Sequence, residues 1–308
     1  MQRGRIRTGR YLLKRVRESW QWWLLLLPAV VYVCIFQYGP MYGLQIAFKN
    51  YRPRLGITGS PWVGFEQFAR FLSYPNFWKM ICNTLTITLY SLATFPCAII
   101  FALMLNEVYN IKLKKTMQMI TYAPHFMSEV VVCSLVIMML DRANGPINNL
   151  IAALGGERVA FMTDPNSFAS IYVWSGVWQN LGWDSILFIS ALASISPEVV
   201  EAARIDGANR MQIIRHVNIP GILPTIAITF IMRTGGLLSV GHTKIFLLQN
   251  DLNLDASQVI STYVYNIGLV DGQYSYSTAI GLFNNLANIL VLLLANRIVK
   301  KTTETGLF

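Results

Sequence analysis

Long stretches without a single charged residue constrain this chain more than any other feature. Residues 80–106 and 272–296 contain no Asp, Glu, Lys or Arg, and they are 27 and 25 residues long. A helix needs about 20 mostly apolar residues to cross a bilayer. Hydrophobic residues make up 54% of the chain and charged residues 13%, about half the roughly 25% usual in soluble domains. The sequence therefore predicts an all-α membrane protein, because lipid must cover much of such a surface.

We predict six membrane-spanning helices. They lie near residues 20–41, 80–106, 116–140, 168–195, 220–240 and 272–296. A further apolar stretch, residues 256–270, is short for a crossing and rich in polar residues, so we expect a helix at the outer surface or a slight re-entry. The membrane domain accordingly covers residues 20–296, between a basic tail of residues 1–19 and a second tail of residues 297–308.

The distribution of Lys and Arg predicts the orientation. Six spans place both termini on one side, and the segments on that side carry 16 of the 25 cations, seven of them in residues 1–17. Cytoplasmic segments are usually the Lys/Arg-rich ones, so both termini are expected in the cytoplasm. The basic tail leads directly into Trp20, Trp22, Trp23 and an apolar run, which favours an uncleaved membrane anchor. Nucleic-acid binding would need a basic patch on a folded face.

The segment between the fourth and fifth predicted spans, residues 196–219, predicts two short helices joined by a turn. Ser196 can cap the first helix, and the proline and glutamates after it suit a helix N-terminus. Gly207 supplies a turn that a side chain would hinder. The second helix, about residues 209–217, is expected to stop before Pro220. Such an element, held by a span at each end, suits docking to a partner and transmitting its movement.

This segment resembles the EAA loop of binding-protein-dependent ABC importer permeases. The matching pattern is Glu201-Ala202-Ala203, three residues, Gly207, nine residues, then Val217-x-Ile219-Pro220. The resemblance implies that the loop docks into a separate ATPase subunit. The coupling positions that it implies are Glu201, Ala202, Ala203, Asp206, Gly207 and Pro220.

Other short motifs extend the resemblance along nearly the whole chain, toward the LplB-like oligosaccharide branch. They are Leu27-Pro28-Ala29, Tyr38-x-Pro40-Met41-Tyr42-Gly43, Trp62-Val63-Gly64, Leu105-Asn106-Glu107, Gly235-Gly236-Leu237-Leu238-Ser239-Val240-Gly241 and Ser275-Tyr276-Ser277-Thr278-Ala279. The resemblance implies the type I importer fold and a bacterial cytoplasmic membrane. It also implies the partners: a second homologous permease, two cytoplasmic ATPase subunits, an extracellular sugar-binding protein and an oligosaccharide substrate. Whether the permease pair is a homodimer or a heterodimer stays open.

The sequence gives no sign of chemistry of its own. It has no Gly-x-x-x-x-Gly-Lys-Ser/Thr phosphate loop, so no cofactor is expected in this chain, and ATP and Mg²⁺ are expected on the partner ATPase subunits. No catalytic motif and no His or Cys at metal-ligand spacing is apparent, so we expect neither a catalytic centre nor a metal site. The four cysteines are expected to be reduced thiols packed as small hydrophobes.

Three ionisable residues fall inside predicted spans, where charges are costly and usually functional. Glu129, Asp184 and Arg233 each lie about 18–20 Å from the cytoplasmic end of their spans, taken as straight helices. Two interpretations remain open. Either Arg233 pairs with Asp184 or Glu129 and fixes the helix packing, or one or more of the three line the sugar path.

Polar stripes and tryptophans are further candidates for the path. Asn284 and Asn288 share one face of the sixth span, and Trp178 lies one turn from Trp174 on the fourth. Small polar residues also tighten membrane helix packing, and tryptophans also sit at the membrane interface, so the alternatives stay open for the asparagines and for Trp178. The outer segments 42–79 and 241–275 are candidates for contacting the binding protein, or ordinary polar loops.

Two functions from other classes and one from the same class are alternatives to the oligosaccharide ABC permease. A proton-coupled secondary transporter would use Glu129, Asp184 and Arg233 as a relay and would show internal repeats, and no convincing repeat is apparent. A membrane enzyme would need a cluster of catalytic polar residues at one interface. An ABC permease for a non-sugar solute would share the loop and differ only in substrate.

Overall fold

The computed structural model of the chain describes residues 19–303. Within these residues every regular element is helical, apart from one isolated antiparallel bridge between Lys49 and Trp62. The predicted all-α fold is therefore confirmed. Most of the predicted basic tail, residues 1–18, and residues 304–308 of the second tail lie outside the described residues.

Four continuous helices within residues 19–303 are long and apolar enough to cross a bilayer, and they overlap the predicted spans one, two, five and six. Their bounds are Trp20–Phe48, Phe77–Asn106, Arg210–Thr234 and Tyr274–Lys301. The elements within them are α2 (Trp20–Val33), η1 (Cys34–Tyr38), α3 (Gly39–Met41) and η2 (Tyr42–Phe48); α6 (Phe77–Ala93) and α7 (Phe95–Asn106); α13 (Arg210–Ile213), η4 (Ile214–Asn218) and α14 (Ile219–Thr234); and α18 (Tyr274–Thr303).

The third predicted span is sharply bent. Its inner part, α8 (Ile111–Tyr122) and η3 (Ala123–Phe126), makes an angle of 104° with α9 (Glu129–Leu140). Pro124 lacks an N–H and disfavours a continued helix, and Ser128 caps a new one by accepting a hydrogen bond from the Val131 N–H at 3.4 Å. The straight helix assumed for the depth of Glu129 is therefore wrong.

The fourth span bends where the loop was expected to begin. Helix α11 (Pro165–Ala193) makes an angle of 71° with α12 (Pro197–Ile205). If each bent pair counts as one span, the described residues contain up to six crossings.

The second helix of the loop does not stop before Pro220, contrary to the sequence-based expectation. Residues Arg210–Thr234 form one continuous helix. The five residues of η4 widen it locally into a π-turn just before Pro220. A π-turn alters the hydrogen-bond register, so a proline without an N–H is accommodated one residue into α14.

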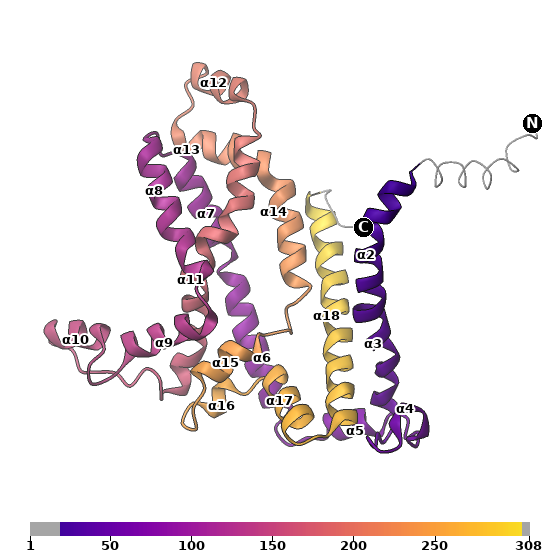
Figure 1. Ribbon diagram of the computed structural model, residues 1–308. Coiled ribbons are helices and arrows are strands. Elements are labelled where there is room, and N and C mark those ends of the chain that lie inside the picture. Colours follow the sequence, from indigo (N-terminus) through magenta and orange to yellow (C-terminus); the bar gives the residue numbers. More distant parts are fainter. Residues whose placement is uncertain (1–18, 304–308) are drawn as a thin grey trace, which may run out of the picture.

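The short helices gather at the end of the molecule opposite α12 (Figure 1). They are α4 (Gly56–Gly59), α5 (Glu66–Leu72), α15 (His242–Leu248), α16 (Leu254–Ser257), α17 (Ile260–Tyr265) and η5 (Asn266–Val270), with α10 (Pro146–Ala153) beyond the end of α9. The apolar stretch at residues 260–270 is a short helix, too short for a span. These elements lie on the side where the sequence predicts the outer loops.

Three buried clusters hold the helices together. Phe95, Ala102, Phe188 and Ile222 belong to the cluster that joins α7, α11 and α14. A second cluster joins α6, α9, α11 and α15, and a third joins α5, α6, α17 and α18. In contrast, α2 has no buried residue, and every one of its residues is exposed within the described chain.

Candidate functional site

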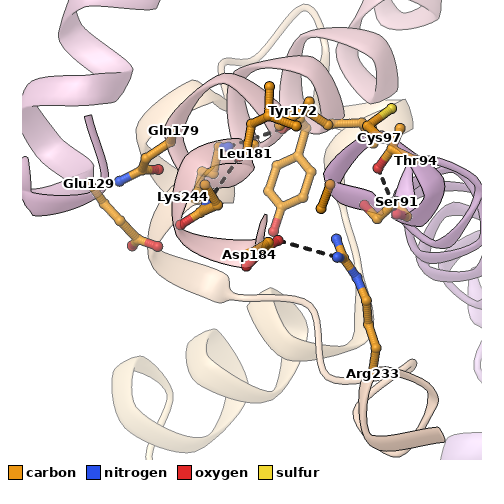
Figure 2. A pocket seen from close by; sticks show the side chains of 15 residues that line it. Ser91, Thr94, Cys97, Glu129, Tyr172, Gln179, Leu181, Asp184, Arg233 and Lys244 are labelled. Atoms are coloured by element: carbon orange, nitrogen blue, oxygen red, sulfur yellow. Dashed lines mark hydrogen bonds and ion pairs between the residues drawn. The ribbon is translucent and has the colours of Figure 1, made fainter. Parts of the chain in front are cut away.

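A polar cavity of about 450 Å³ lies between the membrane helices (Figure 2). Residues from α6, α7, α9, α11, α14 and α15 surround it, so it joins elements that are distant in the sequence. Its lining residues are Ser91, Thr94, Cys97, Ala98, Glu129, Tyr172, Val173, Gly176, Val177, Gln179, Asn180, Leu181, Asp184, Arg233 and Lys244.

The three ionisable residues predicted inside the spans all line this cavity. Arg233 on α14 pairs with Asp184 on α11, with 3.3 Å between Nη1 and Oδ2, and each side chain is 38% exposed. The guanidinium also lies 6.0 Å from the ring centre of Phe95. The pair therefore links two spans, as the first interpretation expects, and at the same time both side chains face the cavity. Glu129 begins α9 and approaches the cavity from the other side (Figure 2).

Lys244 is a fourth charged group in this cavity, and sequence reasoning missed it as a site residue. Its side chain is 6% exposed. The ammonium donates a hydrogen bond to the Tyr172 carbonyl oxygen at 3.0 Å and lies 4.9 Å from the centre of the Tyr172 ring. Burial lowers its pKa to about 8. The only signal in the sequence was that Lys244 is the single cation of residues 241–275.

The break in the third span is anchored to α11 beside the cavity. His125 Nδ1 lies 2.8 Å from Asn180 Oδ1, and the His125 ring stacks on Trp183 at 4.2 Å between centres. The Gln179 amide donates to the Met127 carbonyl oxygen at 3.3 Å. These contacts fix the position from which Glu129 starts α9. They include His125 in the packing of this break against α11.

Trp178, a candidate for the path, lies outside the charged cavity. Its side chain is 47% exposed and does not line the charged cavity. Its neighbour one turn earlier, Trp174, donates a hydrogen bond to the Tyr90 hydroxyl at 2.8 Å. The spacing in the sequence predicts that Trp174 and Trp178 share one face of α11, but it does not predict which way that face is turned.

Asn284 and Asn288 hold the chain segment that follows α14. Asn288 Oδ1 accepts a hydrogen bond from the Leu238 N–H at 2.8 Å, and its amide donates to Ser239 Oγ at 2.9 Å. The Asn284 amide donates to the Leu238 carbonyl oxygen at 3.3 Å. Asn288 is buried, and both its amide oxygen and its amide nitrogen are used in these bonds. Asn284 also borders a second hollow.

This second hollow, of about 620 Å³, lies between residues 239–242, α17, η5 and α18. His242 stacks on Tyr265 at 5.4 Å between ring centres. Two buried atoms of its lining residues, Asn284 Oδ1 and Ser261 Oγ, have no hydrogen-bond partner in the described structure. Buried polar atoms are normally paired; Asn284 Oδ1 can only accept a hydrogen bond, and Ser261 Oγ can accept or donate one. Aromatic platforms and hydrogen-bonding side chains are the groups that bind sugars.

The loop at the opposite end of the molecule has the expected turn. Ser196 Oγ accepts a hydrogen bond from the Glu198 N–H at 3.3 Å at the start of α12. Gly207 has φ = 81°, a conformation that disfavours any side chain. Asn209 and Gln212 form a capping box at the start of α13.

The exposed face of this loop is partly apolar. Glu201, Ala202, Asp206 and Gly207 are exposed. The side chains of Ile205 and Met211 are 86% and 70% exposed. The sequence pattern did not single out these two residues. A rigid turn that presents apolar and acidic side chains is suited to a protein contact.

Comparisons with known proteins give one consistent family. Residues 69–304 match the family model described as "Binding-protein-dependent transport system inner membrane component". The chain is 39% identical over 300 residues to the polygalacturonan/rhamnogalacturonan transport system permease protein YteP of Bacillus subtilis (strain 168), covering 97% of this chain and 93% of YteP. It is 41% identical over 293 residues to protein LplB of the same organism, covering 95% and 92%.

A solved structure has the same fold. It is the crystal structure of a bacterial alginate ABC transporter in complex with an alginate pentasaccharide-bound periplasmic protein. One of its chains is 39% identical to this chain, with a TM-score of 0.88, covering 96% of this chain and 99% of that one.

Proposed function

We infer the function from one premise: the chain belongs to the family of binding-protein-dependent transport system inner membrane components. It is a multi-pass membrane permease subunit of an ABC importer, because the family match, the relatives and the solved fold agree. This membership favours the importer over the proton-coupled transporter and the membrane enzyme.

We propose that the transported solute is an oligosaccharide. The observation that carries this proposal is the polar cavity of about 450 Å³ between apolar membrane helices, in a chain whose relatives are named for polysaccharide transport. The hollow beside Tyr265 and Asn284 adds stacked rings and unpaired polar atoms. On this proposal Glu129, Asp184 and Arg233 belong to the path. Asn284 borders it, and Asn288 supports it through the segment after α14.

We propose separate partners for energy and for delivery. Two cytoplasmic ATPase subunits would bind ATP and Mg²⁺ and contact the loop through Glu201, Ala202, Ala203, Asp206 and Gly207, with Pro220 at the start of the span that moves. An extracellular binding protein would deliver the sugar at the other end, as the complex in the related solved structure suggests. A second permease would complete the path. The termini and the loop then lie in the cytoplasm.

The mechanism follows from this arrangement. Closure of the ATPases would push or pull α12 and α13, and α13 continues without a break into α14. Arg233 is near the far end of α14, so movement of the loop would reach the Arg233–Asp184 pair and change access to the cavity. Alternating outward and inward opening would carry the sugar across.

Variants of the loop test the coupling. Glu201→Lys reverses an exposed charge, and Gly207→Val places a β-branched residue at φ = 81°, so each should reduce ATP-driven uptake about tenfold or more, since 1.4 kcal/mol of lost coupling is enough for that factor. Uptake of labelled oligosaccharide and the amount of permease in the membrane are measured together. Glu157→Lys, an exposed charge reversal in the outer segment, is the matched control and should leave uptake unchanged. Normal uptake by both loop variants would refute the docking role.

A further inference from the structure

Lys244 is a buried cation without an acidic partner at ion-pair distance. Among residues 19–301, the ion pairs join Lys79 to Asp255 and Arg233 to Asp184. The Lys244 ammonium makes one hydrogen bond, to the Tyr172 carbonyl oxygen, and the rest of its donor capacity is open. A buried ion that lacks a counter-ion is costly. The Lys244 ammonium at the cavity wall is therefore suited to pair with a negatively charged group of a ligand.

The position of this ammonium is set by its neighbours on α11. A Cβ added at Gly176 would lie 3.2 Å from Lys244 Nζ, so the glycine leaves the room that the ammonium occupies. The Tyr172 ring, 4.9 Å away, stabilises the charge by a cation–π contact. Lys244 is thus held at the cavity and does not extend toward bulk water.

Arg233 presents a second open cation to the same space. Its guanidinium contacts Asp184 through Nη1 alone, although the planar fork can bind a carboxylate through two parallel hydrogen bonds. The side chain lines the charged cavity and two adjoining hollows. A ligand that passes through any of them therefore meets this guanidinium.

The two acids of the cavity have a different role. Asp184 is engaged by Arg233, and Glu129 lies at the start of α9. Together they bring two negative charges to the wall that carries the two cations, which limits the cost of placing charge between membrane helices. For an anion bound in this cavity, the two carboxylates would weaken the net attraction, and release is a requirement for any transport path.

We propose that Lys244 and Arg233 form a carboxylate-binding subsite, and that the oligosaccharide carried by this permease is acidic, with uronate carboxylates that these two side chains bind. The inference rests on the proposed function, oligosaccharide import, and adds the charge of the substrate and the residues that recognise it. The polysaccharides named for the relatives, polygalacturonan and alginate, are both uronate polymers. Lys244 supplies a point charge, and Arg233 supplies oriented donors.

The test compares one sugar with and without its charge. Proteoliposomes holding the complete transporter, its binding protein and internal ATP are given trigalacturonate or fully methyl-esterified trigalacturonate. The ratio of the two uptake efficiencies is measured for the wild type and for variants. Since every variant receives sugar from the same binding protein, the preference of that protein cancels when ratios are compared. Equilibrium binding of both probes to the purified complex without binding protein gives a second readout.

Lys244→Met should lower the acid-to-ester ratio about tenfold, the factor expected for one charge-assisted contact, and Lys244→Arg should retain most of it. Arg233→Lys, which keeps the charge and loses the fork, should lower the ratio several-fold, and it provides a readout if Lys244→Met fails to assemble. Lys49→Met is the matched control. Lys49 is also buried and bonded to one carbonyl oxygen, that of Ile57 at 2.7 Å, beside an aromatic ring, but it does not line the cavity.

The possible outcomes separate the two proposals. Equal uptake efficiency for the acid and the ester in the wild type would overturn the carboxylate subsite and leave oligosaccharide import standing. An acid-to-ester ratio that is unchanged in Lys244→Met would do the same. Transport by the wild type of a neutral trisaccharide such as maltotriose, but of neither uronate trisaccharide, would overturn the subsite alone. Failure to transport trigalacturonate, its ester, trimannuronate and the neutral trisaccharide would overturn oligosaccharide import, and the subsite with it.

Discussion

At the scale of single residues, the pair of Arg233 and Asp184 combines a structural and a functional role. The two side chains lie on α14 and α11, and both are partly exposed to the cavity. Removing one partner leaves the other charge unpaired between membrane helices, which costs more than the pair itself contributes. The pair is therefore a point where helix packing and cavity access depend on the same contact.

A double-mutant cycle measures this contact. Arg233→Ala and Asp184→Ala should each destabilise the purified complex, and the double variant should recover part of the loss. The expected coupling is about 1 kcal/mol, since the pair is partly exposed. Thermal unfolding of the detergent-solubilised complex gives the comparison, and Glu157→Ala, far from the pair in sequence and exposed, is the control. If the double variant is no more stable than the less stable of the two single variants, the pair is ruled out as a stabilising contact.

The sequence could predict part of the site at this scale. Glu129, Asp184 and Arg233 were recognisable because ionisable residues are rare in apolar spans, and the partner of Arg233 was narrowed to two acids. Lys244 was not recognisable, because its burial depends on Tyr172 and Gly176 on another helix. Local composition carries no information on such a contact.

At the scale of elements, the contact of α11 with α8 fixes the bent third span. A Cβ on Gly182 would lie 2.4 Å from the Thr121 carbonyl oxygen and 2.6 Å from its carbonyl carbon. Only glycine, which has no Cβ, lets the backbone of α8 approach α11 this closely, and small residues serve the same purpose at other close crossings of membrane helices. The contact lies next to the break that positions Glu129.

Gly182→Ala should therefore destabilise the protein by roughly 1–3 kcal/mol, the usual cost of overpacking. The amount of monodisperse complex after purification and its thermal midpoint are measured against Gly43→Ala, whose added Cβ meets nothing within 4 Å. Equal stability of the two variants would show that α8 and α11 are not closely packed in the membrane.

The elements also show which boundaries local sequence can specify. The start of α12 at a capping serine and proline was predictable, and so was the turn at Gly207, because each depends on adjacent residues. The 104° bend after η3 was not, since Pro124 indicates a kink but not its angle. The continuation of α13 through Pro220 was missed because a π-turn can absorb a proline that would otherwise end a helix.

At the scale of the whole molecule, three features lie in series. The loop around Gly207 is at one end and the short outer helices are at the other (Figure 1). The charged cavity lies between the spans that join them, with α15 forming part of its wall. Apolar composition and charge-free runs were sufficient to predict this all-helical architecture. Which helices pack against each other could not be predicted in this way, because the clusters that join α7 to α11 and α6 to α15 depend on contacts between distant segments.

The central claim is that a separate motor opens this bundle through its loop. The most direct measurement is uptake of labelled oligosaccharide by proteoliposomes that contain the permease with its partner permease and binding protein, with and without the ATPase subunits and internal ATP. We expect uptake only when both the ATPases and ATP are present, and none when a proton gradient replaces them. Sustained accumulation of sugar by this chain without nucleotide and without the ATPase subunits would contradict the account.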